Sequence, residues 1–117
     1  MLNLGHTFGH AVEKTAGYGR YLHGEAVAIG TVMACELSKR LGLSDERGKV
    51  EKVLTRLGLP VSVNYKVSAA DFMEAIAHDK KNAGGELKFV LVEKIGSAIT
   101  RIVPRAEVEK VVADFLG

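Results

Sequence analysis

The sequence predicts a mainly α-helical domain that carries one small β-hairpin. Three observations lead to this fold class. Apolar residues recur at helical spacing through most of the 117 residues, two short β-branched segments flank a glycine-containing turn at residues 94–97, and 47% of the residues are hydrophobic. A chain of this length can bury one hydrophobic core, so we expect residues 1–117 to form a single domain.

The first expected helix runs from Asn3 to Glu13. At about 100° per residue, Asn3, His6 and His10 fall within about 60° of one another on one face. The apolar residues gather on a separate packing face, which consists of Leu4, Phe8, Ala11 and Val12. Gly9 costs about 1 kcal/mol relative to alanine inside a helix, and it indicates close approach by another backbone or by a ligand. A metal or ligand site, a solvated face and an N-cap at Asn3 all stay open at this point.

His23 strengthens the case for a site. It follows a glycine-aromatic turn at residues 17–21 and precedes a long helix that we expect over Glu25–Leu41. A helix, a tight return and a second helix N-terminus can bring His23 back beside His6. Two neutral imidazoles from different elements form half of a zinc-type site, which usually also needs a third protein ligand.

The helix over Glu25–Leu41 is apolar nearly all round as far as Cys35. We therefore expect it to be the central buried helix, with Cys35 as a core residue rather than a nucleophile. Gly42 is expected to cap its C-terminus. The next helix is expected to open at Ser44, with two acidic residues in its first turn, and to end at Gly58. Its buried face is expected to consist of Val50, Val53, Leu54 and Leu57.

Residues 61–67 are expected to form an extended connector. Ser68 and Asp71 then form a capping-box pattern at the start of a short helix, and residues 78–82 are expected to leave its end. The buried side of this helix is expected to consist of Phe72, Met73, Ile76 and Ala77.

The last third of the chain contains the predicted hairpin. Its strands are expected at Leu87–Val92 and Ala98–Val103. Pro104 is expected to open a final helix, since proline suits the first helical position. The inward residues of that helix are expected to be Val108, Val111, Val112 and Phe115.

Two segments resemble the signature segments of the 3-dehydroquinate synthase family. They are LNLGHTFGHA at residues 2–11 and LHGEAVAIG at residues 22–30, and the resemblance continues at DKKN, residues 79–82, and at residues 89–91. It covers almost the whole chain but only the C-terminal part of the family's length. It therefore implies the C-terminal helical domain of the dehydroquinate synthase-like fold, and we expect the chain to be a C-terminal fragment of a larger two-domain enzyme.

The resemblance also implies an activity. Members of the family convert 3-deoxy-D-arabino-heptulosonate 7-phosphate into 3-dehydroquinate and phosphate, a lyase reaction of the shikimate pathway. They use NAD and a divalent metal, zinc or cobalt. NAD is expected to bind mainly to an N-terminal nucleotide-binding domain, so no cofactor-binding residue is assigned in this chain. The full-length enzyme is expected to be a homodimer, and residues 1–117 alone are expected to be inactive.

The resemblance assigns roles by matching position. His6 and His23 are expected to be metal ligands, with a glutamate of the N-terminal domain as the third. Asn3 and His10 are expected to contact the substrate, with His10 handling protons near the phosphate. This assignment differs from the simple HxxxH interpretation, in which His6 and His10 hold the metal. Substrate binding is further expected from one of the two lysines Lys80 and Lys81, with Lys80 favoured.

Nearby acidic residues have plainer interpretations. Glu13 is expected to be a solvated helix residue, with a contact to His10 as the alternative. Glu25 lies in the first turn of its helix, where the helix dipole favours a carboxylate. Neither residue is assigned a functional role from the sequence.

Composition excludes several classes of protein. The net charge of +2 is too small to indicate nucleic-acid binding, and the apolar run from Ala26 to Cys35 is too short to span a membrane. A single cysteine and the absence of a signal-peptide pattern fit a cytoplasmic protein. The alternatives that stay open are a related sugar-phosphate cyclase, a metal-dependent polyol dehydrogenase and a non-enzymatic helical module that binds a metal or a partner protein.

Overall fold

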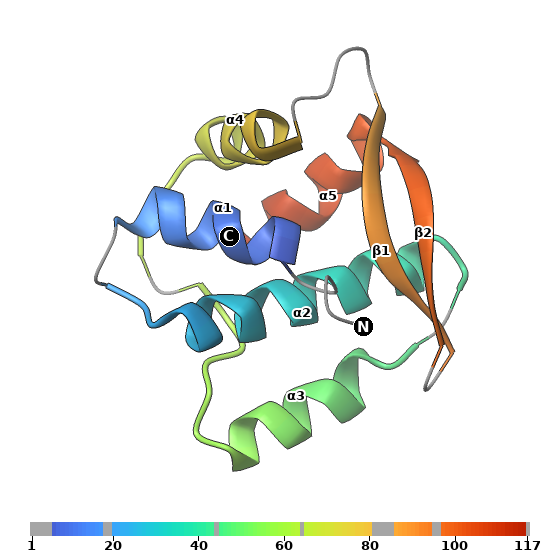
Figure 1. The fold of residues 1–117 in the computed structure, drawn as a ribbon, viewed down its shortest axis with the longest axis horizontal. Coiled ribbons are helices and arrows are strands. Elements are labelled where there is room, and N and C mark those ends of the chain that lie inside the picture. Colours follow the sequence, from blue (N-terminus) through green and yellow to red (C-terminus); the bar gives the residue numbers. More distant parts are fainter. Residues whose placement is uncertain are drawn as a thin grey trace.

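The computed structural model describes residues 6–17, 20–43, 45–63, 65–80, 86–94 and 97–116. For the described residues between 78 and 102, this description is limited to the backbone, except at Ile99, whose side chain is also described. The elements in chain order are α1 (His6–Ala16), α2 (His23–Arg40), α3 (Arg47–Arg56), α4 (Ala69–Lys80), β1 (Glu86–Lys94), β2 (Ser97–Pro104) and α5 (Arg105–Leu116) (Figure 1). The predicted helical domain with one hairpin is confirmed.

Helix α2 lies at the centre of the domain, as predicted. It contacts α1, α3, α5 and β1 (Figure 1). Ile29, Val32 and Met33 are fully buried, and Cys35 is 1% exposed. Burial raises the pKa of the Cys35 thiol to about 11, so the group stays protonated at neutral pH and behaves as a core residue. None of the described helices is long and apolar enough to cross a membrane.

Both ends of α2 have identifiable caps. The helix begins at His23, two residues before the expected Glu25, and Leu22 is its N-cap residue. The backbone N–H of Leu22 donates to Glu25 Oε1 over 2.8 Å, so Glu25 has the structural role that we expected. At the other end Gly42 adopts φ +78°, a conformation that glycine adopts without strain, and this confirms the predicted C-terminal cap.

Helix α1 packs closely against α2 at Gly9. A Cβ atom at Gly9 would lie 3.1 Å from Val27 Cα and 3.2 Å from the carbonyl oxygen of Ala26. The close approach that Gly9 indicated is therefore an approach by another backbone, that of α2. This contact fixes the distance between α1, which carries His6 and His10, and the first turn of α2.

The prediction for α3 is wrong in two respects. The helix begins at Arg47, with Glu46 as its N-cap residue, whereas Ser44 lies outside the described residues. Half of the expected buried face is exposed, because Val53 is 56% and Leu57 68% exposed, whereas Val50 packs against the core and Leu54 is half-buried. The physical reason is the position of the helix, which packs against α2 and lies away from α1 and α4 (Figure 1). It meets α5 through Arg47, whose guanidinium lies 4.6 Å from the centroid of the Phe115 ring.

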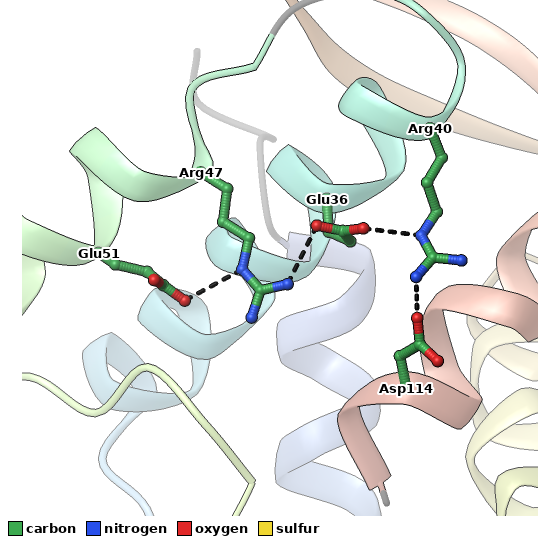
Figure 2. Close-up of polar contacts among 5 residues, drawn as sticks. All are labelled: Glu36, Arg40, Arg47, Glu51 and Asp114. Atoms are coloured by element: carbon green, nitrogen blue, oxygen red, sulfur yellow. Dashed lines mark hydrogen bonds and ion pairs between the residues drawn. The ribbon is translucent and has the colours of Figure 1, made fainter.

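A charged network connects α2 with α3 and α5 (Figure 2). The buried Glu36 carboxylate accepts from Arg40 Nε over 2.7 Å and from Arg47 Nη1 over 3.0 Å. Arg47 also pairs with Glu51, and Arg40 pairs with Asp114 of α5. Burial by itself raises the pKa of Glu36, but the hydrogen bonds and charges of Arg40 and Arg47 outweigh it and place that pKa below its ordinary value.

Helix α4 has the predicted N-cap, because the backbone N–H of Asp71 donates to Ser68 Oγ over 3.0 Å. Phe72 and Ile76 are fully buried. Residues 78–80 belong to the helix and do not leave its end, which corrects the sequence expectation. Residues 69–83 contain no glycine or proline, so no helix-breaking residue ends the helix earlier.

The hairpin is longer than predicted. Its strands pair antiparallel from Glu86 opposite Pro104 to Lys94 opposite Ser97, with an irregularity between Val92 and Lys94. Pro104 belongs to β2, and α5 begins one residue later. The inward residues of α5 are as predicted, with Val108, Val111 and Val112 fully buried and Phe115 packed against the core.

Candidate metal centre

Three histidines lie together at the junction of α1 and α2. His6 is the first residue of α1, His10 follows one turn later, and His23 is the first residue of α2. The ring centroids are 5.8 Å apart for His6 and His10, 5.8 Å for His6 and His23, and 6.2 Å for His10 and His23. The predicted return of the chain, which brings His23 beside His6, is confirmed. We call these three residues the imidazole cluster.

One nitrogen of the imidazole cluster has no partner. Nδ1 of His6 is buried, and within the described residues nothing hydrogen-bonds to it. A buried polar atom without a partner costs about 1–3 kcal/mol. Such a cost is typical of a position whose partner is a ligand. His10 and His23 are exposed, and the side chain of His23 retains 59% of its accessible surface.

Glu13 joins the imidazole cluster from the next turn of α1. Both of its carboxylate oxygens lie 3.3 Å from His23 Nδ1. The interpretation of Glu13 as a simply solvated residue is therefore wrong, and the structure shows a contact with His23, which neither sequence interpretation included. The spacing within α1 suggested His10, which lies three residues earlier. Only the packing of α1 on α2 brings His23 within reach.

The donor set fits a zinc or cobalt ion but is incomplete within the described residues. Two imidazoles on one tetrahedral zinc, with Zn–N bonds of about 2 Å, have ring centroids about 5 Å apart. The separations in the cluster are close to this value. Yet no three His, Cys, Asp or Glu side chains among the described residues are placed so as to hold a metal ion. The cluster can thus supply imidazole nitrogens to a metal, and further ligands have to come from elsewhere.

The distances do not by themselves decide which two histidines are the ligands. His6 lies 5.8 Å from both His10 and His23. The contact of Glu13 with His23 is compatible with His23 as a ligand, because metal-bound histidines typically donate their second ring N–H to a carboxylate, a backbone carbonyl or water.

The remaining predicted site residues are described in part or not at all. Asn3 and Lys81 lie outside the described residues. Lys80 is the last residue of α4, and the structure describes its backbone but not its side chain. Helix α4 packs against α1, and the two run antiparallel, so the end of α4 and the start of α1 lie on the same side of the domain (Figure 1).

Comparison of the sequence with known proteins identifies a family. Residues 1–82 match the family model described as 3-dehydroquinate synthase C-terminal. The chain is 54% identical over 100 residues to the 3-dehydroquinate synthase of Pseudomonas fluorescens, an alignment that covers 84% of this chain and 27% of the relative. It is 46% identical over 119 residues to that of Acidithiobacillus ferrooxidans, with 99% and 32% covered. The chain thus spans about a third or less of the length of the curated relatives it matches.

Solved structures show the same fold. A 2-deoxy-scyllo-inosose synthase complexed with carbaglucose-6-phosphate, NAD+ and Co2+ matches with a TM-score of 0.84 and 23% identity, over 97% of this chain and 34% of that one. A 2-epi-5-epi-valiolone synthase from Streptomyces hygroscopicus with NAD+ and Zn2+ bound matches with a TM-score of 0.77 and 30% identity, over 96% and 31%. The expected dehydroquinate synthase-like fold is confirmed.

Proposed function

Because the chain belongs to the 3-dehydroquinate synthase C-terminal family, we propose that it forms the metal- and substrate-binding domain of a 3-dehydroquinate synthase. The whole enzyme would convert 3-deoxy-D-arabino-heptulosonate 7-phosphate into 3-dehydroquinate and phosphate. The observation that carries the proposal is the imidazole cluster, in which His6, His10 and His23 meet at the junction of two helices and the buried Nδ1 of His6 has no hydrogen-bond partner in the part of the chain that the structure describes.

The proposal assigns His6 and His23 to the metal. A bound zinc or cobalt ion would supply a Lewis acid that orients a substrate oxygen. Neutral imidazole is the form of histidine that binds a metal. The third protein ligand is proposed to come from the N-terminal domain, which agrees with the incomplete donor set of the described residues.

The other residues are proposed to act on the substrate. The His10 ring centroid lies 5.8 Å from that of His6 and 6.2 Å from that of His23, and an imidazole in this place can transfer a proton at the leaving phosphate. Asn3 is proposed to hydrogen-bond substrate hydroxyl groups. One of Lys80 and Lys81 is proposed to pair with an anionic group of the substrate, since an ammonium binds carboxylate or phosphate as a point charge.

The larger protein is proposed to consist of two domains in a cytoplasmic homodimer. NAD is proposed to bind mainly to the N-terminal domain. Two observations support a nucleotide site outside these residues: the curated relatives are about three times as long as this chain, and the similar solved structures contain NAD+. The single cysteine, buried and unpaired, fits a reducing compartment.

A related sugar-phosphate cyclase is the second candidate, favoured by the structural match with a TM-score of 0.84 to 2-deoxy-scyllo-inosose synthase. Sequence identity favours the first, at 54% to a 3-dehydroquinate synthase against 23% to that cyclase. Fold similarity alone does not determine the substrate.

Turnover by the intact enzyme tests the proposal. Purified full-length protein with NAD and zinc or cobalt should release phosphate from the heptulosonate phosphate and form 3-dehydroquinate. Glucose 6-phosphate, which lacks the carboxylate, is the matched control and should give no phosphate. Release from glucose 6-phosphate alone would establish the second candidate, and release from neither substrate would favour the non-enzymatic alternative. Residues 1–117 alone should release no phosphate from either substrate.

A further inference from the structure

Glu13 and His23 form a carboxylate–histidine pair between α1 and α2. Both carboxylate oxygens lie 3.3 Å from His23 Nδ1. The Glu13 side chain is 21% exposed, so the carboxylate is the better shielded partner. Both oxygens of the carboxylate are thus directed at this one ring.

The pair follows from the antiparallel register of the two helices. Gly9 touches Val27 at the closest point of the backbones. One turn along α1 from Gly9 is Glu13, and one turn back along α2 from Val27 is His23. The glycine contact therefore aligns the carboxylate with the imidazole one turn away. This contact lies at the hydrophobic core, since Ala26 beside Val27 is fully buried.

A carboxylate at Nδ1 determines which nitrogen of His23 can bind a metal. An ionised carboxylate only accepts hydrogen bonds, and a neutral imidazole has a single N–H. The proton is therefore held on Nδ1, and the lone pair is on Nε2. Exposed ion pairs contribute about 0–1 kcal/mol to stability, so the pair has little value as a structural link.

We propose that Glu13 is a positioning residue that fixes the tautomer and orientation of His23, so that Nε2 is presented to the metal. The inference rests on the proposed function, because it assumes that His23 is a ligand. Loss of such an outer partner typically reduces metal affinity about 10- to 100-fold. The negative charge of Glu13 also makes Nε2 of His23 a stronger electron donor to the metal. The uncharged amide that Glu13→Gln introduces would have a far smaller effect.

The test uses the full-length enzyme and measures zinc affinity by competition with a chelator, together with the visible absorption of the cobalt-loaded protein. Glu13→Gln and Glu13→Ala should weaken zinc binding about 10- to 100-fold and alter the cobalt spectrum. Turnover should recover in part at saturating metal. Glu109→Gln, a change at an exposed glutamate of α5 that pairs with Arg105, is the matched control and should leave both readouts unchanged.

The His23→Ala variant distinguishes a failure of the metal assignment from a failure of the positioning role of Glu13. If His23→Ala retains the wild-type zinc affinity, the metal assignment itself is wrong, and with it the role of Glu13. If His23→Ala loses zinc while both Glu13 variants keep the wild-type affinity and spectrum, the positioning role is overturned and the proposed function stands. Should Glu13→Ala fail to fold, Glu13→Gln, which keeps the size of the side chain, decides the question.

Discussion

At the scale of single residues, the geometry of the candidate site depends on a glycine that carries no functional group. Gly9 lets the α1 backbone lie against Val27 and Ala26 of α2. The imidazole cluster and the Glu13–His23 pair both span this contact. A side chain at residue 9 would therefore separate the two halves of the site.

Gly9→Ala should destabilise the protein. The added methyl group would lie 3.1 Å from Val27 Cα and 3.2 Å from the Ala26 carbonyl oxygen, and neither backbone atom can move without its helix. Overpacking of this kind costs about 1–3 kcal/mol, which exceeds the gain of about 1 kcal/mol in helix propensity. Denaturant unfolding measures the difference. The control is Gly48→Ala in α3, where nothing lies within 4 Å, and it should leave stability unchanged or raise it. Equal effects of the two substitutions would contradict the packing role of Gly9.

The sequence predicted that the histidines meet, but it did not predict that Glu13 pairs with His23. The glycine-aromatic turn before His23 indicated correctly that this ring returns to His6. The partner of Glu13 could not be predicted, because spacing within one helix gives its neighbours on that helix only. The pairing with His23 depends on the register of α1 against α2, which is a tertiary property.

At the scale of elements, the charged network is the main polar connection of α2 to α3 and α5 (Figure 2). Glu36→Gln should destabilise the protein by about 1–2 kcal/mol, since two arginines lose a charged acceptor but each is about a third exposed and screened by solvent. Thermal unfolding at neutral pH measures this loss. Glu107→Gln, at an ion pair of α5 with an exposed lysine, should have little effect.

The same network should appear in the acid dependence of stability. The pKa of Glu36 is lowered in the folded protein, so its contribution is present above the ordinary value of 4.5 and is lost as pH falls through the folded pKa. The stability difference between the wild type and Glu36→Gln should therefore shrink below about pH 4.5. A difference that stays constant down to strongly acidic pH would show that the carboxylate charge does not matter.

Helix α3 illustrates where element prediction from sequence fails. Periodicity identified its apolar face, but it could not tell whether another element covers that face. Here Val53 and Leu57 are exposed. For α2 the same reasoning succeeded, because a helix that is apolar nearly all round has to be covered in any compact fold. Helix α5 has the same apolar spacing as α3, and its face is buried because α5 packs against α2, α4 and β2.

Substitutions at Val53 and Val111 should differ for this reason. Val53→Ala removes methyl groups from an exposed position and should change stability by no more than about 0.5 kcal/mol. Val111→Ala removes them from a fully buried position and should cost about 2 kcal/mol. Paired chemical denaturation of the two variants makes the comparison. A large loss at Val53 would mean that this face of α3 is covered in the intact protein.

At the scale of the whole molecule, a compact domain carries an incomplete site. The Cα radius of gyration is 13.0 Å, which matches the value of about 13 Å for a compact domain of this size. Yet the described residues contain no three-ligand metal group, and the chain spans about a third or less of its curated relatives. The described residues therefore form a compact unit, whereas the proposed activity belongs to the larger protein.

The metal content of the intact enzyme tests the central claim most directly. His6→Ala, His10→Ala and His23→Ala would each be purified from zinc-supplemented medium, and bound zinc would be quantified by elemental analysis alongside turnover. The His6 and His23 variants should lose most of their metal, while His10→Ala should keep its metal and lose turnover. A His10→Ala enzyme without zinc, together with a His23→Ala enzyme that keeps it, would show instead that the HxxxH pair of α1 holds the ion.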